Sequence, residues 1–487
     1  MLCFSFLSLF LLHKKGKICY NKKTLTSKKG EITMKTNLYF HHAVSKIVTI
    51  AFAGLFGIYS FVSGVREVKV EKAENFQPVL RFAVCSDAHL SNEESGIKNA
   101  EKFRKMFSKA YEISADKLDA VLVAGDMTEG GRAEEYKIYR DLTKECLKGD
   151  TQLLTVMGNH EHIEYRDTST PEKAIEVFKE YVSDEVDYHK VICGYHFIGV
   201  SYDASGKEEF KTKLEWLRAE LDKAVADTGD KPVFVMQHPH PALTVYGSVN
   251  WANMDIRIVL KDYPQVVDFS GHSHYAANDP RSIHQSTFTA IGCGAITGAM
   301  GNLSSISGDE YGDGESGTFW LCEVDSNGDI RLRLYDIVSD CFYEDAEYFL
   351  KDVGNLKRRA YTWGRMMAQD TAPTFPDGAK ISAKAENGSV SVSFPEASGY
   401  YRAENYKITL SSNGEAVENK VELSDYTRAT DNEKTVTFEG LKEGQYTVRI
   451  RAFSPYAKRG DTLEWGFSVD KDGKVDAASA TVAEVKK

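Results

Sequence analysis

The chain has 487 residues, of which 42% are hydrophobic and 27% charged, a composition typical of a globular protein with two or three domains. Its 60 Lys and Arg against 71 Asp and Glu give a formal net charge of −11, with no basic block long enough to follow a nucleic-acid backbone. The charge therefore argues against bulk nucleic acid as a partner.

Residues 1–77 are predicted to be a leader. Residues 1–33 have little pattern and are interpreted as an over-extended reading frame, with Met34 as the true start. A short basic segment and an uncharged apolar run follow, which predicts a signal peptide or a membrane anchor over about 34–65. Cleavage near Ser63 and Gly64 and retention as an anchor both stay open. Either way we expect an exported protein that is periplasmic, at the cell surface or secreted, and is anchored if the segment is kept.

Five apolar runs end on residues that can bind a metal. In chain order these ends carry Asp87 and His89, then Asp126, then Asn159 and His160, then His238, and finally His272 and His274. A short buried parallel strand delivers its last residue to the carboxyl edge of a sheet, where open α/β folds bind ligands. His, Asp and Asn side chains bind divalent metals through nitrogen and oxygen. One such histidine is more often a packed residue, but five converging sets favour a metal centre.

Between these runs the sequence predicts covering helices and further strands. Apolar spacing predicts helices over 97–113, about 133–147, 171–182 and 211–225, and two strands around Gly194. The alternation through Asp268 predicts a largely parallel, wound sheet. The turn at 326–329 predicts an antiparallel hairpin at the end of this domain.

Six cysteines lie beyond the leader. Cys85, Cys193, Cys293 and Cys322 fall in strand-like apolar runs without close-spaced pairs, while Cys146 and Cys341 complete the set. An even number in an exported protein permits disulfides. Their positions favour small buried hydrophobic residues instead.

The polar ends of the five runs resemble the motifs of the calcineurin-like metallophosphoesterases. That family's D-x-H, G-D, G-N-H-D/E, H and G-H-x-H pattern is matched by Asp87-Ala88-His89, Gly125-Asp126, Gly158-Asn159-His160-Glu161, His238 and Gly271-His272-Ser273-His274. The resemblance covers about residues 78–340, within a predicted catalytic domain at 78–345. It implies an α/β fold, a four-layer α/β/β/α sandwich with a binuclear metal site at the strand ends.

The resemblance also implies a role for each residue. One metal would be bound by Asp87, His89 and His274, the other by Asn159, His238 and His272, and Asp126 would bridge both. His160 would act on the leaving group, a contribution of typically about 10²–10⁴-fold. The cofactors would be two divalent metal ions (Mn, Fe or Zn), and a hydroxide bridging them would attack a phosphate mono- or diester.

Residues close to these motifs are not expected to bind a metal or to act in catalysis. Glu161 is expected to orient a ligand. His240 could contact substrate or cap a loop, and the loop cap is favoured, whereas His196 and His284 are interpreted as structural or surface residues. Purple acid phosphatases carry a tyrosine ligand shortly after the Gly-Asp pair. Met127, Thr128 and Glu129 stand there instead, which argues against a tyrosinate-iron centre.

Beyond a connecting segment at 346–375, residues 376–487 have wholly strand-like patterning. Alternation over 390–394, 406–410 and 446–452, with turns at Asn387-Gly388 and Asn413-Gly414, predicts an all-β immunoglobulin-like sandwich. The run 440–452 resembles the late strands of fibronectin type III modules. Because the region has no convergent titratable cluster, a spacer or adhesion role is expected.

Three functions remain open from the sequence. The first is an exported phosphoesterase acting on a small phosphate ester. The second is a non-catalytic surface binding or adhesion protein that retains the scaffold. The third is another binuclear hydrolase such as an amidase, which the Gly-Asn-His-Glu block disfavours. Membrane or cell-surface association would use the N-terminal segment and the C-terminal β-domain.

Overall fold

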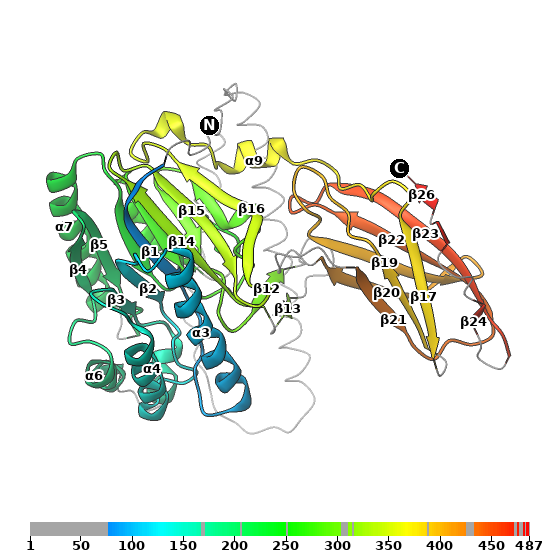
Figure 1. Ribbon diagram of the computed structural model, residues 1–487, viewed down its shortest axis with the longest axis horizontal. Helices are drawn as coiled ribbons and strands as arrows, with labels where there is room; N and C mark the ends of the chain where they lie inside the picture. The colour runs from blue at the N-terminus through cyan, green and yellow to red at the C-terminus, as the bar shows by residue number, and fades with distance from the viewer. Residues whose placement is uncertain are drawn as a thin grey trace, which may run out of the picture. The chain divides into compact units, whose positions relative to one another are not determined.

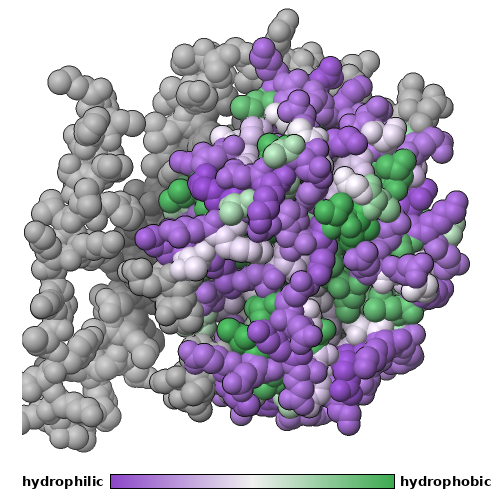
Figure 2. Space-filling model, turned by 90° about the vertical axis from the view of Figure 1, so that its left-hand side faces the viewer, coloured by the Kyte–Doolittle hydropathy of each residue, from purple (hydrophilic) through white to green (hydrophobic). Residues whose placement is uncertain are grey.

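A computed structural model describes residues 76–486, except 167–170, 205–206, 250–251, 303–309, 314–315, 387–388, 425–432, 472–474, 477–480 and 483. All described residues belong to one compact unit, Phe56–Lys487. The predicted signal or anchor lies outside the described residues. Among the helices that the structure describes, none is long and apolar enough to cross a membrane. The face of the first domain in Figure 2 is mostly hydrophilic, with apolar side chains in separate patches.

The first domain contains two six-stranded sheets (Figure 1). One has the order β16-β15-β14-β1-β2-β3, formed by Cys341–Leu350, Ile330–Asp336, Thr318–Asp325, Pro78–Cys85, Ala120–Ala124 and Gln152–Val156. The other has the order β10-β11-β9-β6-β5-β4, formed by Ile283–Gln285, Thr289–Gly292, Val266–Ser270, Val233–Gln237, Tyr195–Val200 and Tyr188–Ile192. Small two-stranded sheets pair β12 (Ala299–Asn302) with β13 (Glu310–Asp313), and β7 (His240–Pro241) with β8 (Ala252–Asn253).

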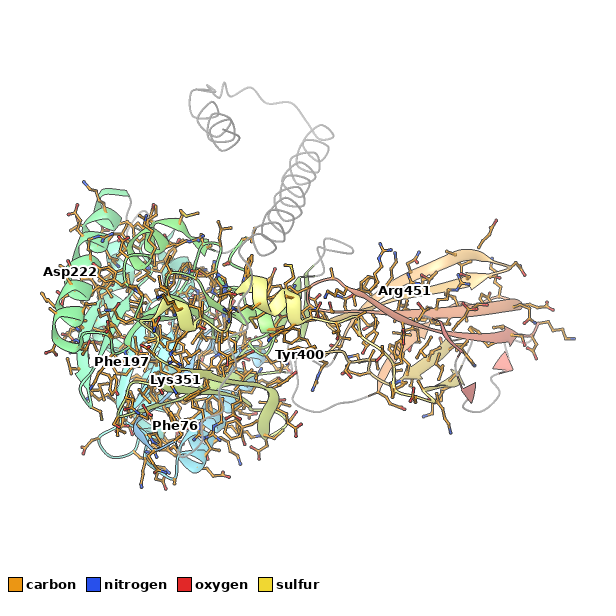
Figure 3. The ribbon with its side chains drawn as sticks, turned by 90° about the horizontal axis from the view of Figure 1, so that it is seen from above. Phe76, Phe197, Asp222, Lys351, Tyr400 and Arg451 are labelled. Carbon is orange, nitrogen blue, oxygen red and sulfur yellow. The ribbon has the colours of Figure 1, made fainter. Side chains whose placement is uncertain are left out.

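The two sheets face each other, and helices cover their outer faces. Because side chains alternate along a strand, Phe82 and Val84 point into the core between the sheets, whereas Ala83 and Cys85 point outward. Phe82 packs edge-on against Phe197, labelled in Figure 3, at a centroid distance of 5.2 Å. Helices α3 (Glu94–Ile113), α4 (Ala133–Cys146) and α6 (Pro171–Tyr181) cover the first sheet, and α7 (Lys207–Thr228) and α8 (Met254–Leu260) the second. The predicted four-layer α/β/β/α arrangement is therefore confirmed.

The largely parallel sheet expected from simple alternation is only partly right. Parallel pairing holds for β1, β2 and β3 and for β5, β6, β9 and β11. Strands β4, β10, β15 and β16 pair antiparallel with chain neighbours, because short hairpins replace the helical crossovers that parallel neighbours need. Strand β14 also pairs antiparallel with the distant β1. The predicted hairpin at 326–329 joins β14 to β15, with Gly328 at φ 84°.

The cysteines are free, and one prediction about them is wrong. Cys85, Cys293 and Cys322 are buried, as expected. Cys193 is exposed, because it occupies the turn between β4 and β5 with φ 50° rather than a strand. No disulfide joins any pair of cysteines within the described part of the chain.

After β16 the chain forms two short helices, η4 (Leu356–Arg358) and α9 (Trp363–Gln369), and then an all-β domain (Figure 1). Its sheets have the orders β21-β18-β17-β25 and β20-β19-β22-β23-β24, with β26 beside β23. In chain order from β17 these strands are Lys380–Glu386, Ser389–Phe394, Asn405–Ser412, Glu415–Leu423, Lys434–Phe438, Gly444–Phe453, Arg459–Val469, Val475–Asp476, Thr481–Val482 and Glu484–Lys486. Its own core includes Val392, Tyr406 and Ile450. The predicted all-β sandwich is therefore present.

Candidate metal centre

The polar residues singled out in the sequence leave their strands at one edge of the first domain. Asp87 and His89 follow β1, Asp126 follows β2, Asn159 and His160 follow β3, His238 follows β6, and His272 and His274 follow β9. The pairs β1–β2, β2–β3 and β6–β9 are parallel, so the carboxyl ends lie side by side within each sheet. The structure brings all eight side chains into one site.

Five of these residues have a left-handed backbone. The φ angles are 54° at Asp87, 46° at His89, 48° at Asp126, 71° at His272 and 55° at His274. Residues other than glycine seldom adopt this conformation, and where they do they cluster at functional sites. Hydrogen bonds hold the turns, including Asp87 N–H to Gly125 O at 3.1 Å and His89 N–H to Asp126 O at 3.0 Å.

Donor atoms form two clusters that share no residue at this edge, and a third, overlapping group consists of His89, Asp126 and His160. In the first, His274 Nε2 lies 3.1 Å from Asp87 Oδ1 and 3.1 Å from His89 Nε2. In the second, His238 Nε2 lies 3.0 Å from Asp126 Oδ2 and 3.1 Å from Asn159 Oδ1. The ligand atoms of each His/Asp set, with His272 in the second set, lie within 4.8 Å of one another.

Asp126 connects the two clusters. Its Oδ2 atom, 3.0 Å from His238 Nε2, is also 3.8 Å from His89 Nε2 in the first cluster. Asp87 and Asp126 are 0% and 1% exposed, so two carboxylates are buried with little solvent around them. A buried pair of carboxylates among imidazole nitrogens fits divalent cations, which supply the missing positive charge. His160 is different, because its side chain is 25% exposed and faces the site from its rim.

Electrostatics link these groups closely. Burial alone would raise the pKa of Asp126, but the charge of His238 outweighs it and lowers that pKa to about 2. Burial would lower the pKa of His238, yet Asp126 raises it to about 9. Burial likewise opposes the charged form of His89, while Asp87 and Glu129 raise its pKa to about 10. Without metal, the positive charge of the protonated imidazoles therefore offsets the negative charge of the carboxylates.

Two regions of the chain match models of known protein families. Residues 80–276, which contain all of these donors, match the family model of the calcineurin-like phosphoesterases. The first domain is a metallophosphoesterase domain. Residues 373–463 match an immunoglobulin-like domain model, the ILCR1 Ig-like domain, so the C-terminal domain is Ig-like and is not confirmed as fibronectin type III.

Other comparisons add little. A search among curated proteins finds no match. Among solved structures, the crystal structure of an engineered protein is 13% identical and covers 78% of this chain and 71% of its own, with a TM-score of 0.18. A similarity that low carries no argument about either domain.

Around the donors of the phosphoesterase domain, Glu161 organises the backbone. This carboxylate is 0% exposed. Its Oε2 accepts from Asp126 N–H at 2.9 Å and Gly158 N–H at 2.6 Å, and its Oε1 accepts from Thr128 N–H at 3.0 Å and Thr128 Oγ1 at 2.8 Å. Burial and the charge of Asp126 raise the pKa of Glu161 to about 7, against these donors. Glu161 therefore fixes the loops that carry Asp126 and Asn159, in keeping with the orienting role expected for it.

Glu129 is the residue that sequence reasoning missed. Its carboxylate Oε2 accepts from His89 Nδ1 at 3.0 Å, which leaves His89 Nε2 to face the site. Its backbone carbonyl accepts from His160 Nδ1 at 2.7 Å. One residue thus orients two histidines. Its position three residues after Asp126 could have identified Glu129 from the sequence. A half-exposed glutamate in a loop, however, belongs to no periodic hydrophobic pattern that would draw attention to it.

The histidines interpreted as structural lie in buried networks. His240 is held between Ser270 Oγ at 2.9 Å and Ser273 Oγ at 2.8 Å. Burial lowers the pKa of His240 to about 3, so this ring stays neutral. His196 and His284 are also buried, on the second sheet. None of the three belongs to the donor clusters found among the described residues.

Proposed function

We propose that the metallophosphoesterase domain hydrolyses a phosphate mono- or diester with two divalent metal ions, bound in the two donor clusters and bridged by Asp126. The observation that carries the proposal is the position of Asp126 Oδ2 between His238 in one cluster and His89 in the other. A carboxylate has two oxygens and can share them between two ions. The ions, when bound, would supply a water of lowered pKa as nucleophile and stabilise charge on the phosphate oxygens.

The protein's own residues have distinct tasks in this proposal. Asn159 contributes a neutral amide oxygen, so only Asp87 and Asp126 offset the roughly +4 charge of two divalent ions, and the site attracts an anion. His160 faces the departing oxygen. Its Nδ1 must carry a proton, because its partner, the carbonyl of Glu129, only accepts. Its Nε2, 4.0 Å from Asp126 Oδ2, is then the atom that would deliver a proton to the leaving group, from the imidazolium form in which both ring nitrogens carry a proton.

Hydrolysis of a chromogenic phosphodiester and the matching monoester tests the proposal. Metal-stripped protein should recover turnover when manganese, iron(II) or zinc is added, and His160→Ala should reduce the rate by about 10²–10⁴-fold. Asp126→Asn should abolish turnover. Asp255→Asn, on the exposed surface of α8, is the matched control. Metal binding without turnover of either ester would instead favour the scaffold-retaining binding protein.

We also propose export, with the segment at about 34–65 as signal or anchor and the Ig-like domain at the cell surface. The apolar run after Met34 supports this proposal. N-terminal sequencing of the exported protein tests it. A mature chain that begins after residue 63 would establish cleavage, and a chain found only inside the cell would refute export.

A further inference from the structure

The loop that follows His238 packs against Ser273 and Tyr275, the sequence neighbours of His272 and His274. Within it, Thr244 N–H donates to Ser248 Oγ at 2.9 Å and Ser248 N–H donates to Val245 O at 3.0 Å, which forms a tight turn. Gly247, at φ 88°, lies so close to Ser273 that a Cβ at this position would be 2.6 Å from the Ser273 Cβ. Ser273 stands between His272 and His274. The position of this turn therefore decides the shape of the site beside two ligands.

Tyr246 holds the turn in place. Its N–H donates to Arg281 O at 2.9 Å, and its ring lies 3.8 Å from the Arg281 guanidinium carbon and 4.4 Å from the ring of Tyr275. Its hydroxyl donates to Glu404 Oε1 at 3.1 Å. Glu404 belongs to the Ig-like domain, so a residue beside the metal centre is bonded to the second domain.

Glu404 is built into a buried ionic network. The Arg281 guanidinium binds Asp279 through two contacts, at 2.8 and 2.6 Å, and forms an ion pair with Glu404. Asp279 is 0% and Glu404 2% exposed. The second oxygen of Glu404 accepts from Asn405 Nδ2 at 3.1 Å. The arginine side chain is 19% exposed, but the carboxylates on both sides of it are buried, and leaving either of them unpaired is costly.

Further contacts join the Ig-like domain to the connecting segment and to the first domain, within the same compact unit. Ser454 Oγ donates to Asp370 Oδ2 at 2.5 Å, and the backbone N–H of Tyr400, labelled in Figure 3, donates to Thr371 Oγ1 at 2.7 Å. Leu423 of the Ig-like domain packs with Ala276 and Ala299. The Glu404 contact is thus part of a broader set of contacts.

We propose that the Ig-like domain helps to shape the phosphoesterase site. Glu404 is a positioning residue that holds the turn at 243–248 in place through Tyr246 and Arg281. The effect on activity that this inference predicts depends on the proposed phosphoesterase function. The position of the turn governs how well substrate fits beside His272 and His274, so its loss should change substrate binding more than chemistry. The expected spacer or adhesion role would give no such dependence.

The test compares Glu404→Gln and Tyr246→Phe with Glu443→Gln, an exposed glutamate of the same domain. With manganese-loaded full-length protein, each of the first two should raise KM about tenfold and leave kcat nearly unchanged, the pattern of lost uniform binding. The double variant should cost less than the sum of the two single changes, because Tyr246 and Glu404 act through one network. Manganese affinity should not change, and Glu443→Gln should behave as wild type.

Hydrogen–deuterium exchange of residues 243–248 gives a readout that does not need activity. Exchange there should be at least about fivefold faster in Glu404→Gln than in wild type, with the strands of the first domain unchanged. If wild type lacks turnover, the proposed function fails, but exchange still decides this inference. Unchanged exchange and unchanged KM in a folded Glu404→Gln would overturn it. If Glu404→Gln does not fold, Tyr246→Phe carries the same comparison.

Discussion

Replacing Glu161 with glutamine should lower the free energy of unfolding of the phosphoesterase domain. The size of the loss follows from the hydrogen bonds that the Glu161 carboxylate accepts. The carboxylate accepts four bonds, two on each oxygen. An amide has one accepting oxygen, so its NH₂ must face two of those donors. If the NH₂ faces Asp126 and Gly158, both backbone N–H groups lose their acceptor. If it faces Thr128, the hydroxyl can rotate to accept, and only Thr128 N–H is left without a partner.

The second orientation sets the expected cost. One lost bond to a charged group and one unsatisfied buried N–H together cost about 2–4 kcal/mol. Glu161→Ala leaves all four donors without the carboxylate and should cost more. Because the Asp126 loop keeps its bonds in Glu161→Gln, metal affinity should fall only about tenfold, at the low end for residues that orient ligands.

Urea unfolding of the metal-free protein at pH 8 measures this cost, since the pKa of Glu161 is about 7 and the wild-type carboxylate is then mainly ionised. Isothermal titration with manganese measures the affinity. Glu172→Gln, on exposed helix α6, controls for the loss of one charge. A Glu161→Gln protein within 0.5 kcal/mol of wild type would refute the reasoning, because four buried donors would then not need the carboxylate.

Three further outcomes are expected. Because the pKa values of His89 and His238 are raised to about 10 and 9, both rings are protonated at pH 7 and must lose protons to bind metal. Metal affinity should therefore rise with pH up to about 9–10, and calorimetry in buffers of different ionisation enthalpy should detect about two released protons; no release would contradict this. Glu129→Ala should weaken metal binding about 10–100-fold, and Glu129→Gln should restore part of it; equal affinity in all three proteins would exclude an orienting role. Gly158→Ala should abolish metal binding in a protein that still folds by circular dichroism, because a Cβ there lies 2.1 Å from Asp126 Oδ1, and full binding would show that the carboxylate can move aside.

The sequence predicted the strand ends of the site well, for a physical reason. Each ligand follows an abrupt change from apolar to polar residues, and parallel strands bring such ends together. The mixed character of the sheets was harder to predict. The turn at Cys193-Gly194 makes β4 and β5 an antiparallel pair that a pattern of alternating helices and strands does not encode, whereas the antiparallel hairpin of β14 and β15 was predicted from its turn.

Contacts between distant residues that lie outside the motifs could not be predicted. The Arg281–Glu404 pair joins residues 123 positions apart, and neither residue lies in a motif. Glu129 contacts His89 across 40 positions from a loop with no periodic pattern. Periodicity reports which face of an element is buried, but it carries no information on which polar partner satisfies a buried charge.

The backbone of the metal centre gives the strongest physical reason to expect that metal stabilises this domain. Five of the candidate ligand residues adopt φ angles between 46° and 71°. At about 1 kcal/mol or more each, this conformation costs roughly 5 kcal/mol, comparable with the whole net stability of a small domain. Hydrogen bonds keep the turns in place, but only the ligand atoms gain from this geometry, so bound cations would offset the strain. Metal at about 100 times its Kd should add about 2.7 kcal/mol, seen as a higher Tm in loaded than in stripped protein and absent in Asp126→Asn. Equal Tm values with metal demonstrably bound would contradict this expectation, because the metal would then bind the unfolded chain as tightly as the folded one.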